Sequence, residues 1–359
     1  MAEEHIPQDA TDGTRERIVG PGRRPEDEDA SIALRPRSLA EFCGQAQVKE
    51  NLEIALRAAQ ARSEALEHVL LTGPPGLGKT SLAHIVAQEM DVPITVTAGP
   101  SIERAGDLVG FLTNLEPGEV LFIDEIHRMP RAVEEKLYSA MEDFRIDIVL
   151  DKGPHARTIS LSLKPFTLIG ATTRPALLTG PMKTRFGIPL HFQFYQVEEL
   201  IQIITRAAGL LEVPLDADGA KEIASRSRGT PRVANRLLRR VRDYAQVKGD
   251  GSITIEAADA ALRMQGVDEK GLDDLDRRFL RAIIDFYEGG PVGIEALAAT
   301  LGEETDTLVD VVEPYLLQIG MVGRTRTGRQ ALLGAYRHLG LSAPTKPAQP
   351  DLFGPARGE

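Results

Sequence analysis

Residues 31–195 alternate short apolar runs with the mixed apolar and polar patterns of helices. Continuous apolar runs of this length, separated by helices, are typical of strands buried on both faces of a parallel sheet. Residues 196–266 read as helices, and residues 269–340 read as three helices followed by a short Gly/Arg-rich hairpin. The pattern therefore predicts an α/β domain, then an all-α domain, then a small helical domain with a hairpin. The apolar runs are HVLLTG, PITVTA, EVLFIDE and FTLIGATT.

The two ends of the chain differ in composition from the middle. Residues 1–30 contain nine acids, four arginines and few apolar residues, and they supply −5 of the formal net charge of −11. Residues 341–359 are rich in proline. We expect both segments to be disordered tails. The overall composition, with 42% hydrophobic and 26% charged residues, is that of a globular protein, and the negative charge argues against nucleic acid coating the whole surface.

Cysteine content and hydropathy limit the cellular setting. Cys43 is the only cysteine, which excludes an intramolecular disulfide framework and a cysteine-based zinc finger, and fits a reducing cytoplasm. No apolar run approaches the ~18 residues that cross a bilayer. The first residues are acidic and polar and lack the apolar segment of a secretion signal. We therefore expect a cytoplasmic protein.

A nucleotide-binding motif follows the first apolar run. Residues 73–80, GPPGLGKT, match the pattern G-x-x-x-x-G-K-(S/T), and they lie between the apolar residues 68–72 and the helical residues 81–90. This strand–loop–helix context lets backbone N–H groups and a helix N-terminus surround phosphate oxygens. Lys79 is expected to reach the β- and γ-phosphates, and Thr80 to offer its hydroxyl to Mg²⁺.

Two adjacent carboxylates end a later apolar run. Residues 120–125, VLFIDE, place Asp124 and Glu125 at the carboxyl edge of the predicted sheet, where open α/β folds bind ligands. Asp124 would hold Mg²⁺, partly through water, and Glu125 would orient or deprotonate the attacking water. The chain contains no Asn-Lys-x-Asp guanine signature. The combination predicts binding and hydrolysis of ATP rather than GTP.

Three further segments resemble those of AAA+ ATPases. Residues 170–175 (GATTRP) resemble sensor 1, residues 182–187 (MKTRFG) resemble the arginine-finger segment, and residues 229–232 (GTPR) resemble sensor 2. The more specific resemblance, over roughly residues 31–335, is to the RuvB family of bacterial Holliday-junction branch-migration motors. The fragments that carry it include LRP, FCGQ, GPPGLGKTSLAHIVAQEM, FIDEIHR, FYQVE, GTPRVANRLLRRVRD and GRTRTGR.

The resemblance implies a fold and a set of site residues. The fold is an AAA+ core with a parallel sheet over residues 31–195, an all-α lid over 196–266 and a winged helix over 269–340. Thr173 would sense the γ-phosphate or the attacking water, and Arg185 would act in trans on the neighbouring subunit's nucleotide. The implied nucleotide-binding residues are Leu34, Arg35, Gly76, Gly78, Lys79, Thr80, Ser81, Asp143, Phe144, Arg145, Tyr195 and Arg232.

An arginine that acts in trans implies an assembly. Such a finger stabilises charge on the transferred phosphoryl group and is worth ~10³–10⁵ in rate, so a monomer would lack a complete site. We therefore expect a homo-hexameric ring. The alternative for Arg185 is a surface cation near a sheet edge, and for Arg232 an exposed helix arginine. His127, beside the two carboxylates, is expected to have a structural role rather than to bind a metal.

Two segments are candidates for contact with other macromolecules. Residues 145–166 read as a β-hairpin with a turn at residues 152–154, which would either extend the sheet or, by the resemblance, dock a RuvA-type junction-binding protein. Residues 314–340 contain four arginines and no acid. A winged-helix hairpin there would contact DNA phosphates, or else the domain would bind protein. The expected DNA-binding residues are Arg324, Arg326 and Arg329.

The predicted function is an ATP-driven ring motor that branch-migrates Holliday junctions in recombination and repair. Its expected partners are duplex DNA at four-way junctions, a RuvA-type protein and a RuvC-type resolvase. The alternatives are a clamp-loader-like or other AAA+ DNA remodeller, and a nucleotide-gated binding module. Residues 349–353 (QPDLF) also resemble a short peptide that docks in sliding clamps.

Overall fold

The computed structural model describes residues 33–149 and 158–343. The chain divides into two compact units, of which the first ends at Asp273 and the second begins at Asp274. The predicted tails lie largely outside the described residues, and the turn at residues 152–154 and the clamp-like peptide at 349–353 lie wholly outside them.

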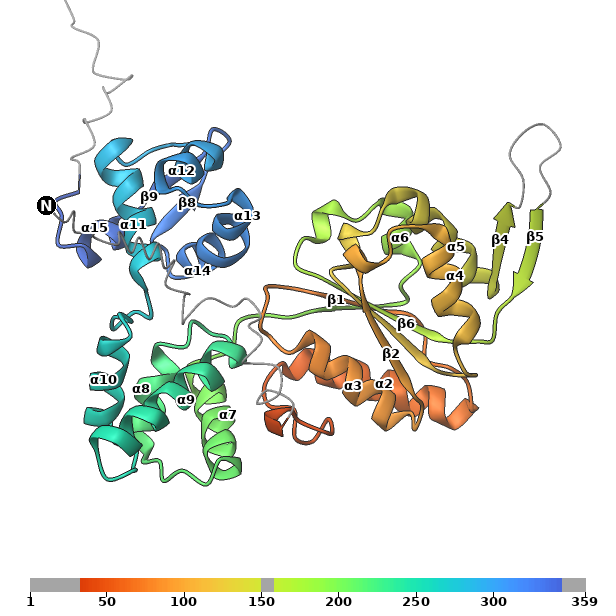
Figure 1. Ribbon diagram of the computed structural model, residues 1–359, viewed down its shortest axis with the longest axis horizontal. Coiled ribbons are helices and arrows are strands. Elements are labelled where there is room, and N and C mark those ends of the chain that lie inside the picture. Colours follow the sequence, from red (N-terminus) through yellow and green to blue (C-terminus); the bar gives the residue numbers. More distant parts are fainter. Residues whose placement is uncertain (1–32, 150–157, 344–359) are drawn as a thin grey trace, which may run out of the picture. The chain divides into compact units, whose positions relative to one another are not determined.

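A parallel sheet of five strands forms the centre of the first unit (Figure 1). The strand order is β2-β3-β6-β1-β7, and every pairing in this sheet is parallel, which confirms the predicted α/β class. The quoted apolar runs became β1, β2, β3 and β6. The bounds are β1 Val69–Thr72, β2 Ile94–Ala98, β3 Val120–Asp124, β6 Thr167–Thr172 and β7 Ile188–His191.

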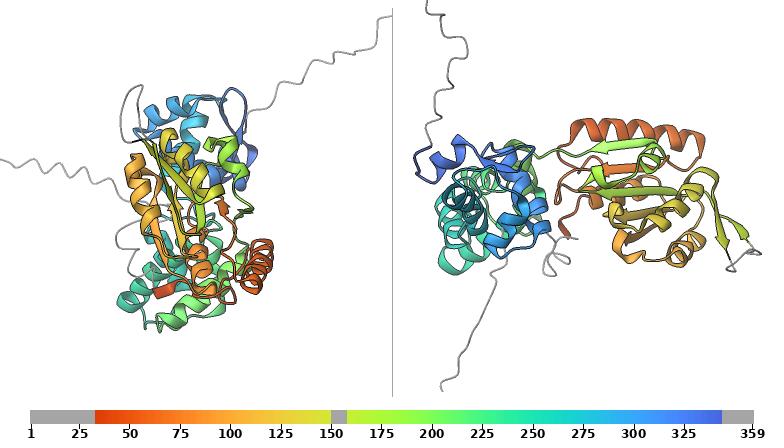
Figure 2. Two further views of the ribbon diagram at one scale, coloured as in Figure 1. Left: turned by 90° about the vertical axis from the view of Figure 1, so that its right-hand side faces the viewer. Right: turned by 90° about the horizontal axis from the view of Figure 1, so that it is seen from above.

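Alternate residues of the strands enter two different cores, one on each face of the sheet. In β3, Val120 and Phe122 join one core and Leu121 and Ile123 join the other. Burial on both faces explains why the strands read as continuous apolar runs. Figures 1 and 2 show helices on both faces. The first core includes α2 (Ala46–Arg62) and α3 (Lys79–Glu89), and the second includes α4 (Ala105–Asn114), α5 (Arg131–Asp143) and α6 (Gly180–Thr184).

A separate hairpin follows α5. Strands β4 (Arg145–Val149) and β5 (Thr158–Ser162) pair antiparallel as a two-stranded sheet of their own. The expectation of a hairpin is confirmed, but within the described residues it does not extend the five-stranded sheet. Ile146 at its base is buried in the second core, whereas Ile159 is 44% exposed.

Four helices complete the first unit after β7. Their apolar faces join the core that contains α2 and α3, which is why they pack against the sheet domain. Side-chain caps start two of them, since Asp216 accepts from Gly219 N–H and Thr254 from Ala257 N–H. The bounds are α7 Val197–Leu210, α8 Ala217–Ser225, α9 Pro231–Lys248 and α10 Ile255–Met264. Short 3₁₀ turns elsewhere in the unit are η1 Gly99–Ser101, η2 Ile126–Arg128 and η3 Pro175–Leu177.

The second unit is a winged helix, as predicted. A bundle of helices precedes a two-stranded antiparallel hairpin, and one short helix follows it. The bounds are α11 Asp274–Arg281, π-helical η4 Ala282–Phe286, α12 Ile294–Leu301, α13 Thr305–Thr307, π-helical η5 Leu308–Val312, α14 Glu313–Gln318, β8 Val322–Arg324, β9 Arg329–Ala331 and α15 Leu333–His338.

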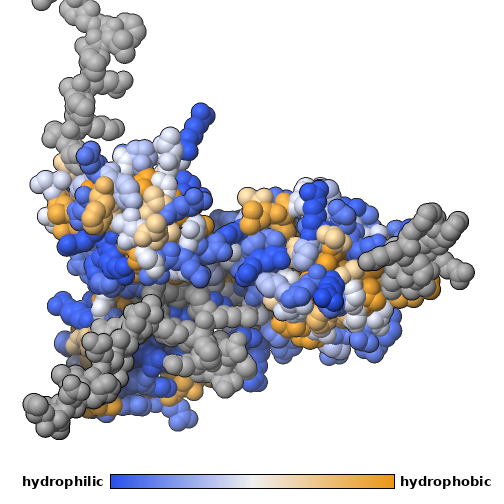
Figure 3. Space-filling view, turned by 45° about the horizontal axis from the view of Figure 1, so that its top comes forward, coloured by the Kyte–Doolittle hydropathy of each residue, from blue (hydrophilic) through white to orange (hydrophobic). Residues whose placement is uncertain are grey.

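The surface mixes hydrophilic and hydrophobic residues over the face seen in Figure 3. Among the helices that the structure describes, none is long and apolar enough to cross a membrane.

Candidate nucleotide site

Glycines shape the loop between β1 and α3. Gly73 has φ +136°, and a Cβ there would lie 2.6 Å from the carbonyl oxygen of Phe192. Gly78 has φ +101° and is the N-cap residue of α3, so it opens the helix in a conformation that L side chains rarely adopt. The loop therefore needs glycine at both positions. It directs the N-terminus of α3 into the cavity, as a phosphate-binding loop requires.

The Lys79 ammonium is held against the same loop. Its Nζ donates to the carbonyl oxygens of Gly73 at 2.7 Å and Pro74 at 2.9 Å, and the residue is 7% exposed. Burial lowers the pKa of Lys79 to about 8, although the charges of Glu125 and Asp124 oppose the shift. A phosphate group would replace the two carbonyls as the partner of this ammonium.

Nucleotide binding is expected to draw a proton onto Lys79 near pH 8. The pKa of about 8 in the nucleotide-free protein would rise beside bound phosphate charge. Affinity for ATP should then be nearly independent of pH below about 7 and fall by up to about tenfold per pH unit above about 8. Calorimetric titration at pH 8, in two buffers of different ionisation enthalpy, should report uptake of about half a proton per site.

A guanidinium at the same position provides the control. Lys79→Arg stays protonated over this pH range, so its proton uptake should disappear. Equal binding enthalpies for the unsubstituted protein in both buffers would contradict the lowered pKa.

The carboxylates at the end of β3 face the same loop. Asp124 and Glu125 both line the cavity, and Glu125 Oε2 accepts from the N–H of Thr173 at 3.3 Å and from its hydroxyl at 3.2 Å. His127 Nδ1 lies 3.2 Å from the same oxygen and 2.8 Å from the hydroxyl of Thr172. Burial alone would raise the pKa of the Glu125 carboxyl, but hydrogen bonds from His127 and Thr173 outweigh this and hold the pKa below its usual value.

Contacts from the four-helix part close the cavity on its other side. The backbone N–H of Arg232, at the start of α9, donates to the carbonyl oxygen of Gly76 at 3.3 Å. The Tyr195 hydroxyl donates to the carbonyl oxygen of Leu77 at 3.1 Å, and burial raises the pKa of this phenol. The phosphate-binding loop is thus bonded directly to the start of α9 and to the segment that precedes α7.

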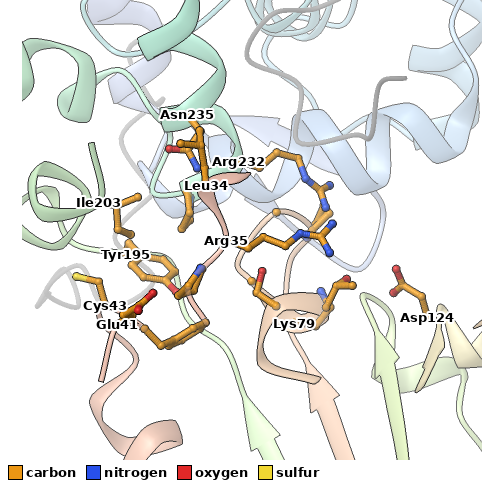
Figure 4. A pocket seen from close by; sticks show the side chains of 18 of the residues that line it. Leu34, Arg35, Glu41, Cys43, Lys79, Asp124, Tyr195, Ile203, Arg232 and Asn235 are labelled. Atoms are coloured by element: carbon orange, nitrogen blue, oxygen red, sulfur yellow. The ribbon is translucent and has the colours of Figure 1, made fainter. Parts of the chain in front are cut away.

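These elements enclose a cavity of ≈ 410 Å³, within the range of small-molecule sites. Figure 4 shows Lys79 and Asp124 toward one side and Tyr195, Cys43 and Glu41 toward the other, with the guanidinium groups of Arg35 and Arg232 above Lys79. The cavity brings together most of the residues predicted for the nucleotide, which are Leu34, Arg35, Gly76, Gly78, Lys79, Thr80, Ser81, Asp124, Glu125, Tyr195 and Arg232.

Family models cover nearly all of the described chain. Residues 34–192 match the Holliday junction DNA helicase RuvB P-loop domain, residues 195–268 the RuvB AAA lid domain, and residues 269–340 the RuvB C-terminal winged helix domain. This chain belongs to the RuvB family. It is thus a P-loop ATPase of the AAA+ class with a helical lid and a winged helix.

Solved structures of RuvB from Thermotoga maritima are similar over most of this chain. The structure titled as the RuvB Holliday junction branch migration motor has 52% sequence identity and a TM-score of 0.80, and the match covers 87% of this chain and 100% of that one. Two mutants of the Thermotoga protein match with 52% identity and a TM-score of 0.81, covering 87% of this chain and 99% of each.

The cavity is also lined by residues that the sequence did not single out. Arg206, on α7, donates to the carbonyl oxygens of Leu34 at 2.9 Å and Arg35 at 3.4 Å, and pairs with Glu41 at 2.8 Å. These bonds attach the segment that carries the predicted nucleotide-binding residues Leu34 and Arg35 to the lid. In the sequence, Arg206 is an ordinary arginine within a predicted helix, and no motif indicates that it makes these bonds. Other unpredicted lining residues include Cys43, Arg128, Gln202 and Asn235.

Five predicted residues lie outside the cavity lining among the described residues, and one of them, Thr173, is bonded to the lining residue Glu125. Arg185 follows α6 and pairs with Glu142 at 3.1 Å. Asp143 ends α5 and pairs with Arg145 at 3.2 Å, while Phe144 packs edge-on against Phe166. The end of α5 therefore lies beside Arg185, and neither contributes to the cavity lining.

The wing arginines of the RuvB winged helix share one buried acid. Glu313 is 0% exposed and receives bonds from Arg324 at 2.6 Å and from Arg329 at 2.8 Å. Burial alone would raise the pKa of Glu313, but its bonds to the two arginines hold the pKa below its usual value. Arg324 remains 54% exposed and Arg329 only 15%, whereas Arg326 lies exposed between the two strands.

Proposed function

We propose that this chain is the subunit of an ATP-driven ring motor that moves duplex DNA to branch-migrate Holliday junctions. The observation that supports it is the convergence of Lys79, Asp124 and Glu125 on one cavity, in a chain whose three parts all match RuvB family models. Phosphate-binding loop, carboxylates and lid together make a site for hydrolysis and not merely for binding.

The donors in the cavity fit Mg²⁺. Thr80 and Asp124 bring a hydroxyl and a carboxylate oxygen to the cavity, and hard oxygen ligands are those that Mg²⁺ prefers. When bound with ATP, the ion would neutralise charge that develops on the phosphates. Lys79 would bind the β- and γ-phosphates, and Glu125 would orient the attacking water while Thr173 holds its carboxylate.

Lid movement would couple the nucleotide to the motor. Arg232 starts α9, and its backbone is bonded to the phosphate-binding loop. A γ-phosphate contact from its guanidinium would favour one lid angle, and loss of that phosphate would release it. Tyr195, at the junction of core and lid, would lie beside the base.

Arg185, Asp143, Phe144 and Arg145 would serve the nucleotide of the next subunit. Their grouping away from the cavity of their own subunit supports a site completed by two copies, and hence a closed homo-hexameric ring. A ring also multiplies weak DNA contacts around one duplex. Arg326 and the exposed part of Arg324 would contact phosphates, with Arg329 acting mainly to fix the wing.

The β4–β5 hairpin is our candidate for docking a RuvA-type protein. It forms a two-stranded sheet of its own, apart from the five-stranded sheet, and Ile159 and Ser160 on it are exposed, so its surface is open to a partner.

The function is tested by ATP-dependent branch migration of a synthetic four-way junction, with and without a RuvA-type protein. Migrated product strands should form with the unsubstituted chain and not with Lys79→Ala, which loses the phosphate-binding ammonium. ATP hydrolysis without junction movement, even with the partner present, would instead favour a clamp-loader-like remodeller or a nucleotide-gated binding module.

A further inference from the structure

The guanidinium of Arg185 is docked on its own subunit by three contacts. It lies 4.3 Å from the centroid of the Tyr138 ring. Its Nη1 donates to the carbonyl oxygen of Pro181 at 2.9 Å, and its Nη2 lies 3.1 Å from Glu142. The side chain is only 20% exposed. A long side chain that must reach a neighbouring subunit is thus already restricted before any neighbour is present.

The three partners hold the Arg185 guanidinium in different ways. Glu142 is 55% exposed, so its ion pair is screened by solvent and holds the arginine weakly. It would also compete with a phosphate for the same guanidinium. The Tyr138 ring attracts the cation through its face and leaves the N–H edge free for other partners.

Tyr138 itself is anchored to both helices of this region. Its hydroxyl donates to Glu134 at 2.7 Å and lies 2.9 Å from the hydroxyl of Thr179, which also donates to Glu134. Thr179 is the N-cap residue of α6 and accepts from the N–H of Met182. The anchors tie α5, which carries the ring, to α6, which leads directly to Arg185.

The surroundings keep the phenol in its hydrogen-bonding form. A phenol already keeps its proton at neutral pH, and burial raises the pKa of Tyr138 further, so the O–H remains a donor. Glu134, which accepts from it, is 8% exposed and therefore fixed within the protein. The orientation of the ring is set by the fold and does not depend on solvent.

We propose that Tyr138 is a positioning residue that presents Arg185 to the nucleotide of the neighbouring subunit. The inference rests on the proposed trans role of Arg185. The ring and the Pro181 carbonyl would keep the guanidinium at the subunit edge, while Glu142 would give way to phosphate oxygens. Rate enhancement by a charged group depends steeply on its position, and a displacement of about 1 Å can cost about 10²-fold. Loss of the ring should therefore lower the rate without changing nucleotide affinity.

Mixed rings separate this role from a general structural one. Glu125→Gln subunits keep an intact finger but lack their own catalytic carboxylate, and Arg185→Ala subunits have the converse defect. If the site is shared, mixing the two restores part of the ATPase activity that each lacks alone. Tyr138→Leu placed in the Glu125→Gln subunit should lower the restored rate about tenfold or more. The same substitution placed in the Arg185→Ala subunit should change it by less than about twofold, because that subunit presents no finger.

Tyr138→Phe is the matched variant. It keeps the ring but removes the hydroxyl that anchors it, so in the finger-donating subunit it should lose clearly less of the restored rate than Tyr138→Leu. Sedimentation velocity on each mixture checks that rings form to the same extent.

Each other outcome has a defined meaning. No recovery in the parent mixture would refute the trans role of Arg185 and hence the proposed shared site. One contrary result is a restored ATPase rate that does not change when Tyr138→Leu is placed in the Glu125→Gln subunit, and another is a rate that falls equally whichever subunit carries the substitution. Either result would overturn the positioning role of Tyr138 and leave the trans role of Arg185 intact. An equal loss for Phe and Leu would assign the effect to the hydroxyl and its bonds and would overturn the role of the ring face. Lost assembly would assign Tyr138 to association instead.

Discussion

Arg185→Ala is expected to lower kcat for ATP hydrolysis about 10³-fold at saturating ATP, with the affinity of the subunit for ATP unchanged. An arginine supplied to the transferring phosphoryl group is worth ~10³–10⁵ in rate. Among the described residues Arg185 is not part of its own subunit's cavity lining, so ground-state binding should not depend on it. Steady-state hydrolysis and fluorescence titration with a labelled nucleotide measure the two quantities separately.

Dilution gives an independent measurement of the same effect. If the site is completed by a neighbour, the rate per subunit of the unsubstituted protein should fall as the ring dissociates and approach that of Arg185→Ala. The variant's own residual rate should not depend on concentration. Lys183→Ala is the control, since it removes an exposed cation from α6, the helix that Arg185 follows. An Arg185→Ala protein as fast as the unsubstituted chain would mean that the arginine is only a surface cation.

The strands with long apolar runs could be predicted because they are buried on both faces. β7 was missing from the quoted runs, since its four residues include a proline and only one is fully buried. Its place comes from pairing with β1, a tertiary contact that local pattern does not encode. The hairpin at β4 and β5 was predicted, but its separation from the large sheet was left open, since a period-2 pattern does not specify which strand lies alongside.

The site residues also divide into those that the sequence predicts and those that it does not. Residues within a contiguous motif, such as Lys79 or Glu125, can be predicted from the spacing of the motif. The same short stretch of sequence determines both the reactive side chain and the backbone conformation that presents it. Arg206 and Glu41 are brought to the cavity by packing of α7 against a segment that lies far from it in sequence. Their pairing follows from the fold alone.

The wing has less free positive charge than its sequence indicates. Residues 314–340 contain no acid, so the arginines there read as available for phosphate. The preceding residue, Glu313, is fully buried and holds both Arg324 and Arg329. A single buried carboxylate next to the counted segment therefore reduces the free positive charge of the wing and fixes its geometry.

Glu125→Gln is expected to lower the rate of the hydrolytic step by about 10²–10⁴-fold while ATP still binds. Glutamine matches the shape of glutamate and can still accept the bonds from Thr173, so the local structure should persist. What disappears is the negative charge facing the attacking water. Single-turnover hydrolysis, together with nucleotide retention on the protein, measures the step directly. Glu135→Gln, an exposed acid on α5, should leave the rate unchanged.

The lowered pKa of Glu125 favours one of its two possible roles. A carboxylate whose pKa lies below its usual value is fully ionised at neutral pH, but it is a weak base. It is therefore better suited to orient the water by accepting a hydrogen bond than to remove its proton early in the reaction. Bonds from Thr173 and His127 that lower the basicity also fix the direction of the carboxylate. Thr173→Val should consequently reduce the same step by less than Glu125→Gln does, because it loosens the carboxylate and leaves its charge in place. A larger loss for Thr173→Val would instead assign the main catalytic contact to the threonine.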